Sequence, residues 1–355
     1  MTFDSVPTGT YLASKKRRIF IMLALAVVLL LVIITAASIG SVDISFGTTL
    51  SVILNKLPFV NITPVWTENI ARIVLEVRLP RVILAALVGA ALATAGATYQ
   101  GLFRNPLADP YLIGVAQGAS LGAVTGFLLP FSLNLAGFGV IPVFAFIGAF
   151  VATIAVYLLA RTGKTVPTTT LILAGVALGA LLSSIVSYLT ITSDEKLHGI
   201  IFWMMGSFAL SQWKEVLVAL PYIAVGITVI LVFSRMINVM QLDEEQAQQL
   251  GVNVERLKLV LLAAATLVTA ASVAFVGTIG FVGIIVPHAV RLLWGADHRF
   301  LLPLSILTGA SFMVLTDLLA RSLLSPTEIP IGVITAVFGA PFFLYLLKRR
   351  KKAIF

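Results

Sequence analysis

Residues 235–258, RMINVMQLDEEQAQQLGVNVERLK, form a polar segment inside an otherwise apolar chain. Runs without a charged residue flank the segment on both sides, 216–234 and 259–290. A membrane protein keeps such a segment in water, and the sequence predicts a short surface helix over Asp243–Leu250 that Gly251 ends. A soluble partner could act on the membrane part through this helix, which indicates a transporter driven from outside itself.

The composition predicts an all-α, polytopic membrane protein. Hydrophobic residues make up 59% of the 355 residues and charged residues only 11%, whereas soluble domains carry about 25% charged residues. The net charge of +9 would suit nucleic acid, but the basic residues lie at the ends of apolar runs. Membrane lipid explains them better, and we expect no nucleic-acid partner. The absence of cysteine excludes disulfides and thiolate metal sites.

Apolar runs long enough to cross about 30 Å of hydrocarbon predict the membrane-spanning helices. The run 259–290 is too long for one helix, and three glycines interrupt it at 277, 280 and 283. We interpret it as two helices joined by a tight turn. About ten helices are therefore expected, over 19–39, 82–103, 112–130, 140–160, 169–191, 216–234, 257–275, 280–294, 300–316 and 329–347.

The chain is predicted to hold one transmembrane domain, 19–348, between a disordered cytoplasmic tail, 1–18, and a basic cytoplasmic tail, 349–355. The basic residues 15–18 resemble the start of a signal peptide, but the apolar run that follows is too long and no cleavage site is visible. We expect an uncleaved first helix in the cell membrane. Cytoplasmic termini place most of the 24 lysine and arginine residues inside, together with 235–258.

The predicted spans hold almost no residues that would couple transport to an ion gradient. Such transporters keep carboxylates or histidines at membrane depth. Here Asp317 lies near the outer end of a span, where Arg321 can pair with it one turn later. His288 follows a proline inside a span, and we interpret it as a hydrogen-bonded packing residue; a proton relay is the alternative.

A nucleotide-hydrolysing site and a catalytic site are also not expected. Gly163-Lys164-Thr165 resembles the end of a phosphate-binding loop, but Leu158 stands where that pattern requires glycine. No catalytic or metal-binding pattern is present, so we expect neither an enzyme nor a cofactor. The remaining classes are a passive channel and the membrane half of a machine, and the segment 235–258 favours the machine.

Several motifs, in order along the chain, carry a family resemblance. They are RLPR (78–81) and the loop RNPLADPYLIG (104–114), LDEEQA (242–247) with LGV (250–252), and GTIGFVG (277–283) with PH (287–288) and Arg291. ILAGVALG (172–179), WMMG (203–206), LLAR (318–321), EIPIG (328–332) and GAP (339–341) also fit. Over about residues 70–348 the chain resembles the FecCD family of permeases, the membrane subunits of ABC importers for ferric siderophores, haem and vitamin B12.

The resemblance implies a fold of ten helices with inverted repeats, and a dimer around a central pathway. It implies three kinds of partner: cytoplasmic ABC ATPase subunits, an extracytoplasmic substrate-binding protein or lipoprotein, and a second permease subunit. Whether the second subunit is identical is left open.

The resemblance also assigns roles at the two membrane surfaces. Arg78, Arg81 and Arg321 would receive acidic residues of the binding protein; the alternatives are interfacial anchoring and pairing with Glu76 or Asp317. The segment 235–258 resembles the family's coupling helices, which lie in a groove of the ATPase; a solvated loop is the alternative. The coupling residues would be Leu242, Asp243, Glu244, Glu245, Ala247, Leu250, Gly251 and Val252.

A cytoplasmic gate is expected in two loops. Asn105-Pro106-Leu107 matches the family's inner gate loop, although this sequence also favours a turn. Thr168 and Thr169 fall at the second gate, but they would equally serve as a helix N-cap. Glycines that we expect to permit close helix contact are Gly89, Gly96, Gly175, Gly179, Gly280 and Gly283.

The predicted function is therefore import of an iron(III)–siderophore complex with ATP hydrolysed by a separate subunit. Vitamin B12 or haem as cargo would leave the fold and the mechanism unchanged. A passive channel and a membrane-embedded enzyme remain as alternatives of other classes, although neither a selectivity filter nor a catalytic cluster is visible.

Overall fold

The computed structural model describes residues 8–129 and 139–351, and this part of the chain is helical without a β-strand. The long and medium helices are α1 (Thr8–Ser38), α4 (Leu79–Leu102), α5 (Val115–Leu128), α6 (Val140–Ala160), α7 (Thr168–Ile191), α9 (Trp213–Val232), α12 (Val254–Val276), α13 (Val282–Trp294), α14 (His298–Ser322) and α15 (Ile331–Lys351). The short helices are α2 (Phe46–Leu54), α3 (Glu68–Arg72), α8 (Leu197–Met204), α10 (Ser234–Val239) and α11 (Glu244–Gln249).

The predicted spans are confirmed as apolar helices. Among the described residues, seven helices are long and apolar enough to cross a membrane, and three shorter apolar helices lie at 115–128, 282–294 and 331–344. Together these ten correspond one to one with the ten predicted runs. The run 259–290 is indeed two helices, α12 and α13, separated where Gly277 and Phe281 adopt positive φ angles of 76° and 70°.

Three boundaries differ from the prediction. Helix α1 begins at Thr8, so residues 8–18 continue the first helix and are not a disordered tail; residues 1–7 lie outside the described part. Between the first two predicted spans, where no helix is expected, the chain forms α2 and α3, and a π-helical turn (Ile73–Arg78) joins α3 to α4. Helix α5 begins at Val115 because a 3₁₀ turn (Pro110–Ile113) ends at Gly114, whose φ is 80°.

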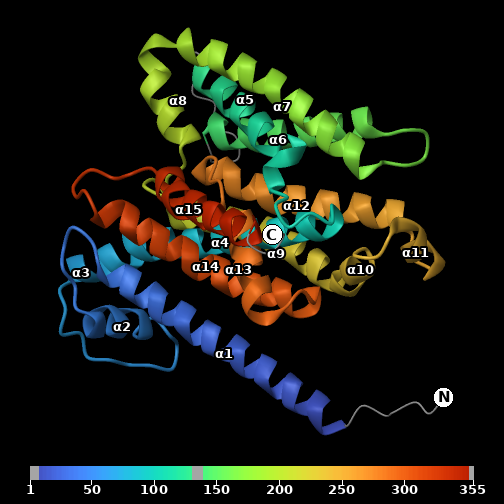
Figure 1. Ribbon diagram of the computed structural model, residues 1–355. Helices are drawn as coiled ribbons and strands as arrows, with labels where there is room; N and C mark the ends of the chain where they lie inside the picture. Colours follow the sequence, from blue (N-terminus) through green and yellow to red (C-terminus); the bar gives the residue numbers. More distant parts are fainter. Residues whose placement is uncertain (1–7, 130–138, 352–355) are drawn as a thin grey trace.

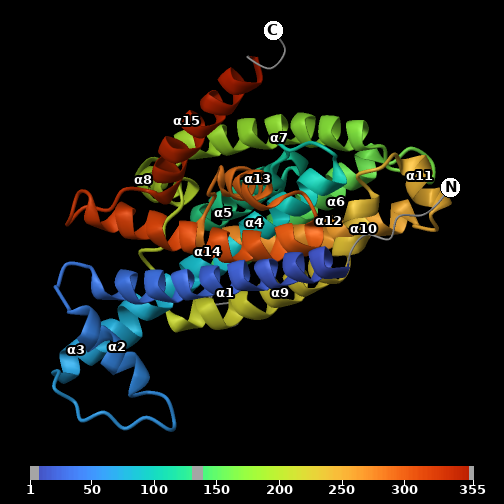
Figure 2. The same cartoon turned by 60° about the horizontal axis from the view of Figure 1, so that its bottom comes forward.

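Helices α4 and α12 form the centre of the bundle. In the most apolar window of α4 83% of the residues are buried and in that of α12 72%, compared with 6% in α1. Helix α4 contacts α9, α12, α13 and α14, whereas α1 packs mainly along α14. Figures 1 and 2 show α1 at the edge of the bundle, with α2 and α3 at one end and α11 at the other.

Glycines permit close contact between segments at four of the six predicted positions, Gly89, Gly96, Gly175 and Gly283. A Cβ atom on Gly96 would lie 1.8 Å from the Gly283 carbonyl oxygen, and one on Gly89 would lie 2.2 Å from the Gly309 carbonyl oxygen. Gly175 similarly approaches the backbone of Leu112. The prediction is wrong for two glycines. Gly280 has open space where a Cβ would lie, and Gly179 faces only the side chain of Gln117 at ordinary contact distance.

Candidate functional site

The end of the bundle that carries α2 and α3 contains a cluster of three arginines and two carboxylates. Arg81 on α4 forms salt bridges with Asp317 on α14, at 2.8 Å, and with Glu328 in the loop before α15, at 2.7 Å. Arg321 lies one turn after Asp317 and approaches the same carboxylate at 3.5 Å. The predicted Asp317–Arg321 pair is thus present, and Asp317 lies between two arginines.

Arg78 and Arg321 also fasten the end of α1 to this cluster. Arg78 donates hydrogen bonds to the carbonyl oxygens of Ala37 (3.1 Å), Ser38 (2.5 Å) and Val42 (2.5 Å). Arg321 donates to the carbonyl oxygens of Ile39 (2.7 Å) and Ala36. These bonds satisfy backbone oxygens that the end of a helix leaves without a partner.

All three predicted docking arginines are therefore close together, but they are mostly enclosed. Side-chain exposure is 11% for Arg81 and 8% for Arg321, and Arg78 is 6% exposed as a residue. Glu76, the alternative partner that the sequence suggested, is exposed. Of the two carboxylates bound to Arg81, Glu328 is the more accessible, because 30% of its side chain is exposed compared with 1% for Asp317.

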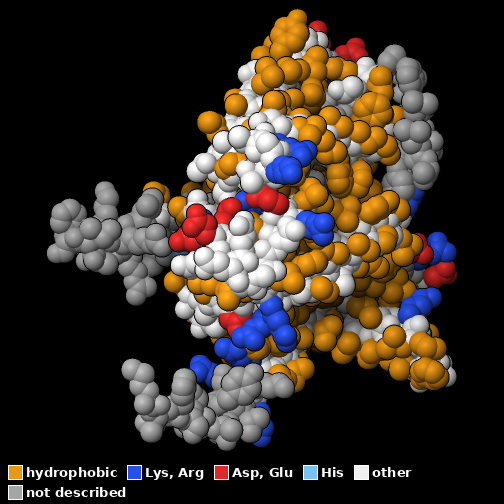
Figure 3. All heavy atoms as spheres, turned by 90° about the vertical axis from the view of Figure 1, so that its right-hand side faces the viewer, with side chains coloured by type: hydrophobic (Ala, Val, Ile, Leu, Met, Phe, Trp, Pro, Cys, Tyr) orange, Lys and Arg blue, Asp and Glu red, His pale blue; other side chains and the backbone are white. Residues whose placement is uncertain are grey.

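At the opposite end, α11 has the form that the sequence predicted. Asp243 precedes the helix in an extended conformation, and Gly251, with a φ of 84°, follows it. A left-handed residue ends helices in this way, and glycine takes that conformation without a steric penalty. Figure 3 shows charged side chains of both signs gathered over this end of the molecule, with hydrophobic side chains around them.

The predicted coupling residues divide into an exposed and a buried group. Leu242 and Leu250 are 44% and 65% exposed, so both are accessible to a partner. Ala247 is fully buried and therefore holds α11 against the bundle. Val252 is half-buried. Asp243 and Glu245 are exposed, whereas Glu244 is partly buried.

The first predicted gate loop forms a tight turn beside α11. The Asn105 side-chain oxygen accepts a hydrogen bond from the Leu107 N–H at 2.9 Å, so the turn interpretation of this loop is correct. Arg104, with a φ of 50°, forms a salt bridge of 2.6 Å with Asp243. Leu107 is 47% exposed, and Pro106 is half-buried. The first gate loop is thus joined to the coupling segment.

The second predicted gate position lies at the start of α7. Pro167 occupies the N-cap position and Thr168 and Thr169 are the first two helical residues, so the alternative of a threonine N-cap is wrong. Thr169 is exposed and Thr168 half-buried. The turn that precedes them, 162–165, is closed by two backbone hydrogen bonds between Thr162 and Thr165.

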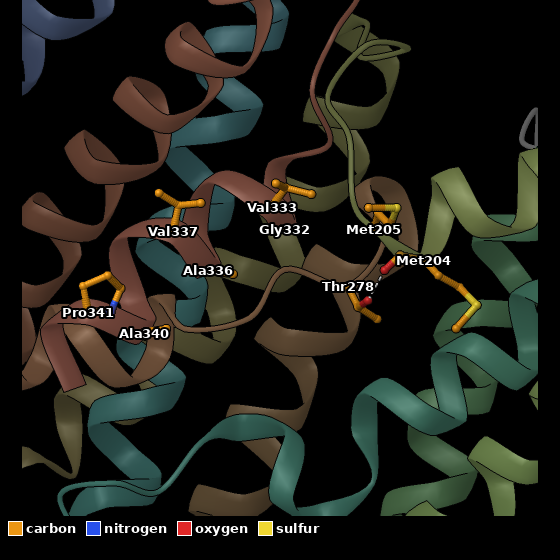
Figure 4. Close-up of a pocket in the computed structure, with 9 residues that line it drawn as sticks. All are labelled: Met204, Met205, Thr278, Gly332, Val333, Ala336, Val337, Ala340 and Pro341. Carbon is orange, nitrogen blue, oxygen red and sulfur yellow. Dashed lines mark hydrogen bonds between the residues drawn. The ribbon is translucent and has the colours of Figure 1, made fainter. Parts of the chain in front are cut away.

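An open apolar groove runs between the end of α8 and the first part of α15. Its volume is about 690 Å³, and its lining residues, drawn in Figure 4, are Met204, Met205, Thr278, Gly332, Val333, Ala336, Val337, Ala340 and Pro341. Among the residues that the structure describes, no charged side chain lines the groove, and the Thr278 hydroxyl is already bonded to the Met204 carbonyl oxygen. Val337, on α15, is 62% exposed.

Sequence reasoning missed one polar group beneath this groove. The Tyr111 hydroxyl donates to the Ile279 carbonyl oxygen at 3.0 Å and accepts from the Ile279 N–H at 3.1 Å. Asp109, which accepts a bond from the Tyr111 N–H at 2.7 Å, is buried enough to raise the pKa of its carboxyl to about 6. The Asp-Pro pair indicates the turn, but only the folded chain brings it to the α12–α13 connection.

Sequence reasoning also missed the role of Lys258, whose position in the polar segment 235–258 suggested a solvated cation. In the structure 3% of its side chain is exposed, and it pairs with Glu244 and Glu255. No sequence signal separates it from the exposed Arg256 two residues earlier.

These features define a multi-pass helical membrane protein with clusters of charged groups at the two ends of the bundle and an uncharged groove beside α8 and α15. The profile of the FecCD transport family matches residues 28–349, and the chain belongs to this family. Its members are permease subunits of ABC transporters, which lack an ATPase site of their own and act with ATPase subunits and another permease subunit.

Three known proteins show the extent of the similarity. The cobalamin import system permease protein BtuC of Halobacterium salinarum is 49% identical over 80% of this chain and 75% of its own length. The hemin transport system permease protein HmuU of Yersinia pestis is 40% identical over 89% of this chain and 92% of its own. A solved inward-facing structure assigned to the metal-chelate type of ABC transporter superposes with a TM-score of 0.81 at 35% identity, covering 93% of this chain and 99% of that one.

Proposed function

We propose that the chain forms one half of a pathway through which a metal chelate enters the cytoplasm. The observation that supports this most directly is the uncharged groove between α8 and α15. Fixed charges in a pathway would hold or exclude cargo according to its sign, whereas small neutral side chains such as Gly332, Ala336 and Ala340 give a bulky chelate little to bind. Such a lining suits a cargo whose selection is left to a separate binding protein.

Two candidate cargoes have support from the sequence or from the comparisons. An iron(III)–siderophore complex is the cargo that the sequence predicts, and the similarity to a hemin permease supports a chelate of iron. Cobalamin, the second candidate, has the stronger support, because the identity to a cobalamin permease is 49% against 40% for the hemin permease. Both cargoes require the same driving reaction, ATP hydrolysis on separate subunits.

The orientation that fits this direction of transport places α11, the gate loops and both termini in the cytoplasm. The exposed Leu242 and Leu250 would then enter a groove of the ATPase, with the charges of Asp243 and Glu245 at its rim. The arginine cluster would lie on the outer side, where the binding protein arrives.

We further propose that docking occurs by exchange of carboxylates at Arg81. Its guanidinium group already holds Asp317 and Glu328, so an incoming acidic residue would replace the more exposed Glu328. Arg78 and Arg321, which are mostly enclosed, would act with it by adding positive charge beside this contact. A bidentate arginine–carboxylate contact gives such an exchange both strength and orientation.

The cargo is tested by uptake in cells that lack this gene and in the same cells with the gene restored. The panel is labelled cobalamin, haem, a ferric hydroxamate and a ferric catecholate. If the cells without the gene fail to take up one of these compounds, and uptake returns when the gene is restored, that compound is the cargo. Uptake that continues after ATP is depleted would instead support a passive channel. In a strain without other chelate importers, uptake of every cargo that is the same with and without the gene would contradict the proposal.

A further inference from the structure

A buried lysine joins three segments at the α11 end of the bundle. The Lys258 ammonium group lies 2.8 Å from a Glu244 carboxylate oxygen and 3.2 Å from a Glu255 carboxylate oxygen. It also donates a hydrogen bond of 3.0 Å to the carbonyl oxygen of Val166. Since only 3% of the side chain is exposed, these three oxygens take the place of water around the charge.

The same site holds the backbone of Val166 from both sides. The second carboxylate oxygen of Glu255 accepts a hydrogen bond from the Val166 N–H at 2.9 Å, while Lys258 binds the carbonyl group of the same residue. Val166 is itself only 2% exposed as a residue. Val166 is thus fixed through its N–H, its carbonyl and its side chain, immediately before Pro167 and the start of α7.

The three segments joined in this way have different places in the proposed mechanism. Glu244 is the first residue of α11, Glu255 and Lys258 belong to the first turns of α12, and Val166 ends the turn that leads to Thr168. Separating Glu244 from Lys258 would leave an almost fully enclosed charge with one carboxylate fewer, which is unfavourable. We therefore expect a movement of α11 to carry the start of α7 with it.

We propose that Lys258 is the positioning residue that transmits a displacement of α11 to the segment in front of Thr168 and Thr169. The proposal rests on the proposed roles of α11 in coupling and of the two threonines in the gate. It adds the connection between them: α11, the start of α12 and residues 162–167 move as one unit, and ATP-driven motion reaches the gate through this unit.

An ion pair also joins the first gate loop to the residue before α11, but it is weaker than the contacts of Lys258. Arg104 and Asp243 lie 2.6 Å apart, but 39% and 74% of their side chains are exposed. Solvent and salt screen an ion pair at such a surface, so its contribution to stability is small. The rigid connection is therefore the one to α7 through Lys258.

The movement is testable by distance measurement, because the chain contains no cysteine and accepts spin labels at chosen positions without background. Lys164 in the turn and Gln248 on α11 are both exposed and suit labelling. The distance between the two labels would be measured by double electron–electron resonance, with and without nucleotide, in the full chain assembled with its ATPase subunits in lipid nanodiscs. We expect a narrow distance distribution between Lys164→Cys and Gln248→Cys that nucleotide does not broaden.

Lys258→Met should broaden this distribution, and Lys258→Arg should keep it narrow. Arg256→Met is the matched control, because it removes an exposed cation from the same turn of α12. Glu244→Gln is a second variant for the case that Lys258→Met does not fold; its side chain is 31% exposed, and it should loosen α11 alone. The proposal would be overturned if Lys258→Met, or Glu244→Gln where Lys258→Met does not fold, gave a distance distribution as narrow as that of the parent.

A transport assay provides the functional readout. In proteoliposomes Lys258→Met should retain ATP hydrolysis near the parent rate while the cargo moved per ATP falls by at least about five-fold, the size expected when a coupling network is interrupted. Lys258→Arg should restore the amount of cargo moved per ATP hydrolysed, and Arg256→Met should leave this amount unchanged. Parallel loss of ATP hydrolysis and transport would indicate a purely structural lysine and overturn the proposal. Absence of transport in the parent would contradict the proposed function, and the distance measurement, which needs no cargo, would then decide this inference alone.

Discussion

Arg81 on α4 and Asp317 on α14 form a salt bridge of 2.8 Å that is almost closed to solvent, with 11% and 1% of their side chains exposed. Asp317 also faces Arg321, so one carboxylate compensates two guanidinium groups that fasten α1, α4 and α14 together. A single residue thus holds the bundle at the end where docking is proposed.

Replacing Asp317 by alanine should therefore destabilise the protein by about 3 kcal/mol or more, because Arg321 loses its carboxylate and Arg81 loses one of two. Glu328→Gln is the control, since Glu328 is 30% exposed and Asp317 continues to hold Arg81. Thermal unfolding in detergent would measure both. Equal shifts of the two apparent Tm values would show that burial of Asp317 does not matter.

Glu328→Gln also tests carboxylate exchange at Arg81. If an acidic residue of the binding protein replaces Glu328, removing this charge should raise the affinity several-fold at low salt, and the gain should fall as salt is added. Charge reversal of Arg81 is a poorer test, because it would break the contact with Asp317 and lower affinity through misfolding alone. An unchanged Kd for Glu328→Gln over the whole salt range would mean that Arg81 is only structural.

The order and nature of the helices could be predicted from the sequence because the bilayer imposes one strong rule: apolar runs become helices. The helix α11 and its end at Gly251 followed from local composition and from the conformation that glycine permits. Residues whose role depends on contacts distant in sequence could not be assigned. Nothing in the sequence distinguishes Lys258 from Arg256, because the difference is burial against Val166, and nothing marks Gly96 as tighter than Gly280.

Gly251 should tolerate asparagine but not valine. Its φ of 84° lies in the left-handed region, where asparagine is accommodated and a β-branched residue is strained by about 1–2 kcal/mol. No atom lies within 4 Å of the Cβ position, so the strain acts on the backbone that ends α11. We expect Gly251→Val to retain membrane insertion and to lose transport per ATP hydrolysed.

The matched control for this substitution is Gly295→Val, which has a φ of 102° and equally open space but lies between α13 and α14. It should strain the backbone without uncoupling transport from hydrolysis. Uncoupling by both variants would assign the effect to general destabilisation, and uncoupling by neither would contradict the coupling role of α11.

Gly96→Ala should be one of the most damaging small substitutions in the chain. Its Cβ would meet the Gly283 carbonyl oxygen at 1.8 Å, so α4 and α13 would have to separate at the centre of the bundle. We expect a loss of about 3 kcal/mol or more, at the upper end for overpacked sites. Gly280→Ala is the control with open space, and an equal effect of the two on unfolding temperature would disprove the close approach.

Asp109 should make stability depend on pH between about pH 4 and pH 6. Burial raises the pKa of its carboxyl to about 6 in the folded chain, from an ordinary value of 3.8. A carboxyl whose pKa is raised by folding lowers the stability of the folded state as pH rises from its ordinary pKa of 3.8 to its folded pKa of about 6, because the unfolded chain ionises first. The shift corresponds to at most roughly 3 kcal/mol, at about 1.4 kcal/mol per pKa unit.

Asp109→Asn should remove this dependence, because an amide oxygen still accepts the hydrogen bond from the Tyr111 N–H but does not ionise. The variant should gain stability over the parent between about pH 4 and pH 6.5 and keep a constant advantage above that range. Thermal unfolding from pH 4 to pH 8 would measure the difference, with Glu195→Gln as the control for an exposed carboxylate. A difference between parent and Asp109→Asn that does not change with pH would show that the carboxyl is not held in a buried environment.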